Sequence, residues 1–178
     1  MIQILWIVGL SFTVLILLFH FGFVRKKSNL SKFTASVQFS NRQKWIFKIT
    51  ILSMIVLMIT GANAVIFSAQ HLTGLGLLIH LSFAPIFAIG LAILVFQWAH
   101  VFQFVEGKEY TLSIKILFWA LAVLVLPVVL SIVLSMHSFF GTEAQYFLSD
   151  LHRVSSLFLV IAAILFLYFI IINRKSKS

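Results

Sequence analysis

Six histidines are the side chains of this 178-residue sequence that are best suited to binding a metal centre. The sequence contains no cysteine, so it offers no thiolate ligands and no disulfides. It has only four acidic residues, and none is expected inside the membrane, so paired carboxylates for acid–base catalysis have no candidates there. Neutral imidazole is a common axial ligand of haem iron. The position of each histidine in the fold therefore decides what chemistry the chain can do.

Composition points to a bilayer as the surroundings of the fold. The chain is 62% hydrophobic and 10% charged, whereas soluble domains carry about 25% charged residues. Continuous apolar runs of about 20 residues cross a hydrocarbon core as helices, while membrane strands alternate. The sequence therefore predicts an all-α integral membrane protein of five transmembrane helices, the last four forming a bundle. The predicted spans are 2–24, 45–67, 72–104, 114–136 and 147–172.

Basic residues at the ends of these runs predict the orientation of the chain. Twelve of the thirteen Lys and Arg residues fall on one side of a five-helix topology, and only Arg153 falls near the other. The positive-inside rule then places the N-terminus outside and the C-terminus in the cytoplasm. We expect the membrane to be a bacterial cytoplasmic (inner) membrane. We expect an extra N-terminal helix (1–24), a basic cytoplasmic loop (25–44), a four-helix bundle (45–173) and a basic tail (174–178). The net charge of +9 is accounted for in this way, without a nucleic-acid partner.

Two histidines are predicted at similar depth on different helices. His80 lies about 12 Å into the third span from the outer side, and His152 about 8 Å into the fifth, at 1.5 Å per residue. An ionisable group at membrane depth is costly and is usually functional, although hydrogen bonding between helices is an alternative role. The remaining histidines are expected in loops or near helix ends: His20, His71, His100 and His137.

Four stretches, in order, resemble the core helices of the cytochrome b (gamma) subunit of membrane-bound formate dehydrogenases and related di-haem, quinone-linked cytochromes. Asn41–Phe67 has a Trp near its start and Thr60-Gly61 near its end, like the first core helix. IHLSFAPIFAIGL (79–91) is similar to the second, with its histidine before a proline-bearing segment. The stretch that opens IKILFW (114–136) is similar to the third core helix, and LHRVSSLFLVIAAILFLY (151–168) is similar to the fourth.

The resemblance implies one pair of haem ligands and the loss of another. It implies that His80 and His152 hold an outer haem b, and that Arg153 is a candidate partner for a haem propionate. The positions of the inner ligands are occupied by Lys44 and Phe166, so the family's quinone site beside the inner haem is in doubt too. His20 and His100 remain weaker candidates for a second haem, because the twenty residues from His80 to His100 turn a helix to nearly the opposite face.

Two functions are compatible with these observations. The first is an electron-transfer subunit of a respiratory or redox complex, with one haem favoured and two still open. The resemblance implies an extracytoplasmic iron–sulfur, cytochrome c or catalytic subunit as its partner, and it leaves quinone open. The second is a haem-free membrane anchor that retains the fold. In neither would the chain catalyse a substrate reaction alone.

Aromatic and small residues receive simpler interpretations. All four tryptophans are predicted to anchor the chain at the membrane interfaces: Trp6, Trp45, Trp98 and Trp119. Small residues of the third span are predicted to permit close helix approach: Thr73, Gly74, Gly76 and Gly90.

Overall fold

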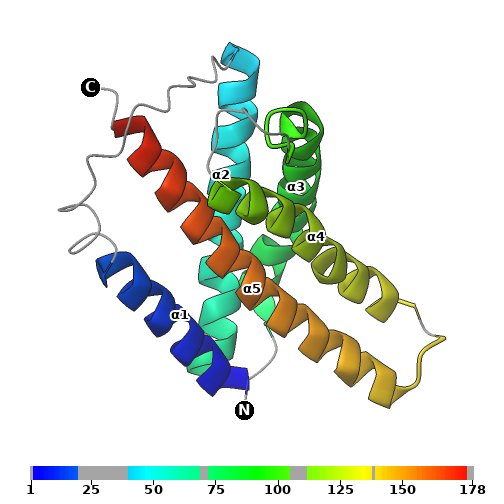
Figure 1. The fold of residues 1–178 in the computed structure, drawn as a ribbon. Coiled ribbons are helices and arrows are strands. Elements are labelled where there is room, and N and C mark those ends of the chain that lie inside the picture. Colours follow the sequence, from blue (N-terminus) through cyan, green and yellow to red (C-terminus); the bar gives the residue numbers. More distant parts are fainter. Residues whose placement is uncertain (1, 20–39, 69–71, 105–111, 138, 176–178) are drawn as a thin grey trace.

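The computed structural model describes residues 2–19, 40–68, 72–104, 112–137 and 139–175 (Figure 1). These residues form five α-helices, the second of which continues directly into a π-helical segment, η2. The elements are α1 (Ile2–Phe19), α2 (Asn41–Ala62), η2 (Asn63–Ser68), α3 (Gly74–Trp98), α4 (Leu112–Ser135) and α5 (Thr142–Lys175).

All five helices are long and apolar enough to cross a membrane. Their outward side chains are largely apolar, as a hydrocarbon solvent requires: Ile89 is 62% exposed and Phe96 is 85% exposed. The chain is an all-α, multi-pass membrane protein, and the predicted fold class is confirmed.

Two antiparallel hairpins form the main body of the bundle (Figure 1). In the hairpin α2–α3, the Thr60 side chain meets His80 at one end, and the Phe47 ring lies 5.5 Å from that of Trp98 at the other. In the hairpin α4–α5, His152 meets the Val128 carbonyl near one end. Helix α1 lies along α5 and runs parallel to it, as an odd number of spans requires.

The two ends of the bundle differ in chemistry, and we call them the histidine end and the aromatic end. The histidine end contains Thr60, His80, Ser131 and His152. The aromatic end contains Trp98, Phe102, Phe118 and Phe166, whose side chains are buried. Of the basic residues in the described ranges, only Arg153 belongs to the histidine end, while Arg42, Lys44, Lys48, Lys115, Arg174 and Lys175 belong to the aromatic end.

Close packing of α2 against α3 depends on Gly90. A Cβ atom added at this position would overlap the Thr50 hydroxyl oxygen, and Thr50 is itself buried. The hydroxyl of Thr50 donates to the Ile46 carbonyl, so it brings no unsatisfied donor into the interface. The predicted role in close approach therefore holds for Gly90. It does not hold for Gly74, where an added Cβ would meet nothing within 4 Å and whose φ of +57° instead suits glycine at the start of α3.

Three of the described helix boundaries differ by four residues or more from those predicted. Helix α2 begins at Asn41 rather than at residue 45, because Ser40 and Gln43 form a capping box. Helix α3 ends at Trp98, and the apolar residues that follow it form a turn. Helix α5 begins at Thr142, five residues earlier than predicted, because its first turns are polar and lie outside the apolar run from which the span was predicted. The predicted loop 25–44 therefore loses its last four residues to α2.

Two of the four tryptophans are not interfacial anchors. Trp6 is 3% exposed and Trp98 is 4% exposed, so both lie inside the bundle. Trp45 is 63% exposed on the first turns of α2, as an anchor requires. An apolar membrane span offers no pattern by which a tryptophan facing lipid can be told from one facing another helix.

Candidate functional site

His80 and His152 come together at the junction of the two hairpins. Their ring centroids are 6.4 Å apart, and the ring planes make an angle of 75°. His80 is in the second turn of α3, and His152 is in the third turn of α5, so each is held by a regular helix rather than by a loop. The predicted similarity in depth is observed as direct proximity.

The imidazole of His80 is anchored to α2 through Thr60. The two side chains approach to 2.8 Å between Thr60 Oγ1 and His80 Nδ1. The Thr60 hydroxyl lies 2.9 Å from the Val56 carbonyl oxygen and 3.1 Å from that of Leu57, so its proton is directed to its own helix. His80 Nδ1 therefore carries the hydrogen and donates it to Thr60 Oγ1.

The imidazole of His152 is anchored to α4 through a backbone carbonyl. Its Nδ1 lies 3.0 Å from the Val128 oxygen, and since a carbonyl only accepts, Nδ1 donates. The buried Ser131 hydroxyl donates to the same oxygen at 3.0 Å and lies 3.4 Å from His152 Nδ1. Two donors thus share one acceptor on the turn of α4 that faces His152.

In each neutral ring, hydrogen bonding at Nδ1 leaves the Nε2 lone pair available to a metal. His80 and His152, with ring centroids 6.4 Å apart, would be the two residues to hold a metal at this place. Two histidines are a complete axial pair for haem but an incomplete set for a bare zinc ion. No group of three or more potential ligands occurs among the described residues. The residues present therefore fit haem iron better than a bare ion.

Gly61 adds space beside this pair. A Cβ atom at Gly61 would lie 3.8 Å from His80 Cε1, so a larger side chain would cover that edge of the ring. Glycine at this position leaves the edge of the imidazole uncovered on the α2 side.

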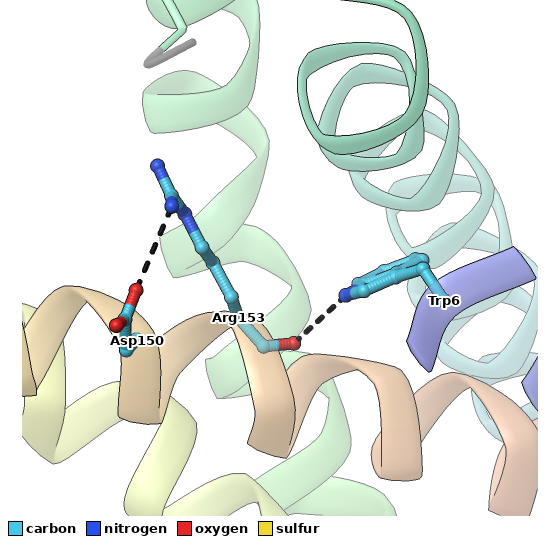
Figure 2. A network of polar contacts seen from close by, with 3 residues as sticks. All are labelled: Trp6, Asp150 and Arg153. Atoms are coloured by element: carbon cyan, nitrogen blue, oxygen red, sulfur yellow. Dashed lines mark hydrogen bonds and ion pairs between the residues drawn. The ribbon is translucent and has the colours of Figure 1, made fainter. Parts of the chain in front are cut away.

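Arg153 follows His152 in the chain, but its guanidinium turns toward Asp150, one turn earlier on α5 (Figure 2). Its Nη1 lies 3.6 Å from Asp150 Oδ1, and the two side chains are 27% and 58% exposed. Asp150 lies within the predicted fifth span, and the early start of α5 adds Glu143 to this helix, so the prediction that no acidic residue would lie inside a span is wrong. Arg153 is thus next to the histidine pair and already has an anionic partner.

The other two histidines in the described part of the chain, His100 and His137, do not join this pair. His137 is exposed beyond α4, with its ring 6.3 Å from that of Phe139. His100 is exposed in the turn after α3, at the aromatic end. His20 and His71 lie outside the described residues, so a pairing of His20 with His100 remains a prediction.

Aromatic side chains fill the opposite end of the bundle around Phe166. The Phe166 ring lies 5.8 Å from that of Phe102 and 6.2 Å from that of Phe118, and the latter two rings stack at 4.4 Å. A cavity of about 50 Å³ remains beside them, with Phe47, Phe87 and Leu121 among its lining residues. Lys44 is exposed on the first turn of α2. Neither the phenyl ring of Phe166 nor the exposed side chain of Lys44 provides an imidazole ligand at this end.

Thr60, Val128 and Ser131 were not predicted as part of the site. Thr60 is visible in the sequence as a hydroxyl residue inside an apolar run. Hydroxyl residues in such runs usually bond to their own helix, as Thr50 and Ser53 do here, so their type alone does not reveal a partner. The Val128 contribution is a backbone oxygen and has no sequence signal.

Comparison of the chain with protein-family models, with characterised proteins and with solved structures found no match. The function of the chain is therefore inferred from the residues of the histidine end.

Proposed function

We propose that this chain is a membrane electron-transfer subunit of a respiratory or redox complex, with one b-type haem held by His80 and His152. The observation that carries the proposal is the meeting of two imidazoles from different hairpins, each anchored through Nδ1. An ionisable group at membrane depth is costly and usually functional, and this favours ligation over simple packing for two imidazoles that meet in this way.

The surrounding residues give each histidine one defined role. Thr60 and the Val128 carbonyl accept the Nδ1 hydrogens, which fixes the tautomer and increases the basicity of Nε2. Haem, when bound, supplies one-electron redox chemistry. Arg153 follows His152 directly in the chain. With haem bound, its guanidinium would exchange the Asp150 carboxylate for a haem propionate, because both partners are carboxylates.

The distribution of charge supports an orientation with the histidine end outside. Within the described ranges, Arg153 is the sole basic residue of that end, and it is accompanied by Glu143 and Asp150. The positive-inside rule then assigns the aromatic end to the cytoplasm of a bacterial cell. An extracytoplasmic iron–sulfur, cytochrome c or catalytic subunit would meet the histidine end. Reporter fusions at Lys27 and Ser178 should both report cytoplasm, and a periplasmic signal at either position would contradict this orientation.

The aromatic end supports one haem rather than two. Phe166 is fourteen residues after His152 on the same helix, about 21 Å deeper, and its phenyl ring cannot coordinate iron. Electrons then would not cross the whole membrane through this chain alone, and a quinone site beside an inner haem has no support in these residues.

The visible absorption spectrum of the purified protein, combined with its haem-to-protein ratio, tests the proposal. We expect a low-spin b-type spectrum and a ratio near one. A chain that expresses and folds without haem under haem-replete conditions would instead be a membrane anchor. A ratio near two, with one haem lost in a His100→Ala variant, would contradict the single-haem proposal.

A further inference from the structure

Helix α1 buries one face, mainly against α5 and to a smaller extent against η2, and its other sides are exposed. On that face Trp6 and Thr13 are each 3% exposed, while Ile4 and Leu18, on the other sides, are 66% and 67% exposed. The Thr13 hydroxyl donates to the Gly9 carbonyl at 2.8 Å and is satisfied within α1. The contact with α5 is therefore specific and is confined to one stripe of α1.

Gly9 lets the two helices approach closely. A Cβ atom added there would lie 3.3 Å from Leu157 Cδ2 and 3.4 Å from Ile161 Cδ1, which is tighter than ordinary contact. Leu157 is 1% exposed, so it has little room to move away. Gly9 and Leu157 thus set the distance between α1 and α5 one turn beyond the candidate ligand His152.

Trp6 makes a polar contact of this interface beside the candidate ligand (Figure 2). Its indole Nε1 donates to the backbone oxygen of Arg153 at 3.2 Å. A second polar contact lies further along the two helices, where the Tyr168 hydroxyl of α5 donates to the Leu17 carbonyl of α1 at 3.5 Å. Arg153 is the next residue after His152, and its side chain pairs with Asp150 across the same turn. This turn of α5 is therefore held by α1 on one side, while the His152 ring is held by Val128 of α4 on another.

The geometry points to Trp6 as a positioning residue for the metal ligand His152, an inference that rests on the proposed function. The indole fixes the rotation and height of the turn 150–153, and with them the direction of the His152 imidazole toward His80. Helix α1, which lies outside the four-helix resemblance, thereby has a role in the redox site without contributing a ligand. Trp6 contacts Arg153 directly at its carbonyl oxygen and acts on His152 through the backbone that joins the two residues.

A matched pair of tryptophans in this chain allows the inference to be tested. Trp119 also donates its Nε1 to a backbone oxygen, that of Phe102, at 3.1 Å, but at the aromatic end. Trp6→Phe and Trp119→Phe therefore remove the same kind of bond near to and far from His152. Electron paramagnetic resonance of the ferric protein reads the relative orientation of two axial imidazole planes. Haem transfer to an excess of an apoprotein acceptor measures retention.

In Trp6→Phe we expect an altered resonance spectrum and haem loss about tenfold faster than in the unmodified protein, as for changes in groups that orient a ligand. In Trp119→Phe we expect both readouts to match the unmodified protein. Equal changes in the two variants, or no change in Trp6→Phe, would overturn the inference while leaving the haem proposal intact. Absence of haem from the unmodified protein would instead overturn the proposed function and this inference with it.

If Trp6→Phe does not accumulate in the membrane, Gly9→Val provides a second test. The valine side chain would push α1 away from Leu157 while keeping the indole. We expect the same spectral change as in Trp6→Phe, because the Trp6 bond to Arg153 would lengthen. A folded Gly9→Val protein with an unchanged resonance spectrum would count against the inference.

Discussion

The histidine end and the aromatic end are built by the same helices, but one contains hydrogen-bonded imidazoles and the other contains packed phenyl and indole rings. At the histidine end, α3 and α5 present imidazoles 6.4 Å apart, and α2 and α4 supply their hydrogen-bond acceptors. At the aromatic end, Phe102 and Phe166 are 5.8 Å apart at their ring centroids, and α4 contributes Phe118. At the histidine end hydrogen bonds orient the imidazole rings, whereas at the aromatic end the rings fill the space between the helices.

This difference shows what a membrane bundle needs in order to retain a ligand site. An imidazole in a bilayer requires a partner for each nitrogen, so the histidine end needs a second residue for every ligand. A phenyl ring requires only neighbours at van der Waals distance. A phenyl ring such as that of Phe166 thus needs no polar residues around it.

Loss of either proposed haem ligand is the largest effect we expect. His80→Ala and His152→Ala should each abolish the haem spectrum, because one remaining ligand holds the group poorly. Absorbance of the purified variants measures this. His137→Ala is the control, since His137 is exposed beyond α4, and it should match the unmodified protein. Unchanged haem content in both ligand variants would rule out the assignment.

Truncation at the aromatic end should reduce stability and leave haem binding unchanged. Phe166→Ala removes a ring that is 5% exposed, which should lower the free energy of unfolding by about 3–5 kcal/mol. Phe158→Ala, on the same helix but 50% exposed, is the control and should change it by much less. Denaturation in detergent mixtures measures both. Loss of haem from folded Phe166→Ala protein would show that the two ends are not independent.

The contact between α2 and α3 should be sensitive to a single methyl group. Gly90→Ala would force α3 away from Thr50, with an expected loss of about 1–3 kcal/mol in the free energy of unfolding. Adding Thr50→Ala removes the overlapping oxygen and should recover part of that loss. The same denaturation experiment measures the cycle. A Gly90→Ala protein as stable as the unmodified chain would contradict the packing described for this hairpin.

The smallest effect separates the two anchors at the histidine end. Thr60→Val removes the acceptor of His80 Nδ1 and should weaken haem binding about tenfold. Ser131→Ala should have a smaller effect, because the Val128 oxygen still accepts from His152. Haem titration of the two apoproteins measures the difference. Equal haem affinities in the two variants would show that the Thr60 hydroxyl orients His80 no more strongly than the Ser131 hydroxyl affects His152.

The five spans and the depth of the two histidines were predictable because they depend on local properties. Apolar length and the count of residues from a helix end place His80 and His152 at one level. The boundaries were less predictable where polar turns extend a helix, as at Thr142, or where a capping box begins one, as at Ser40. The anchors of the imidazoles were not predictable, since Thr60 and Ser131 resemble other hydroxyl residues that bond within their own helix.

The sequence by itself determined the membrane-spanning class and which two histidines lie at the same depth, because both depend on the hydropathy and spacing of neighbouring residues. Only the tertiary structure decided that Trp6 and Trp98 are buried, that Arg153 faces Asp150, and that Val128 accepts from His152. The physical reason is that a uniformly apolar helix carries no periodic signal for the side that meets another helix. In such a helix the partner of each side chain is fixed by packing between segments distant in the sequence.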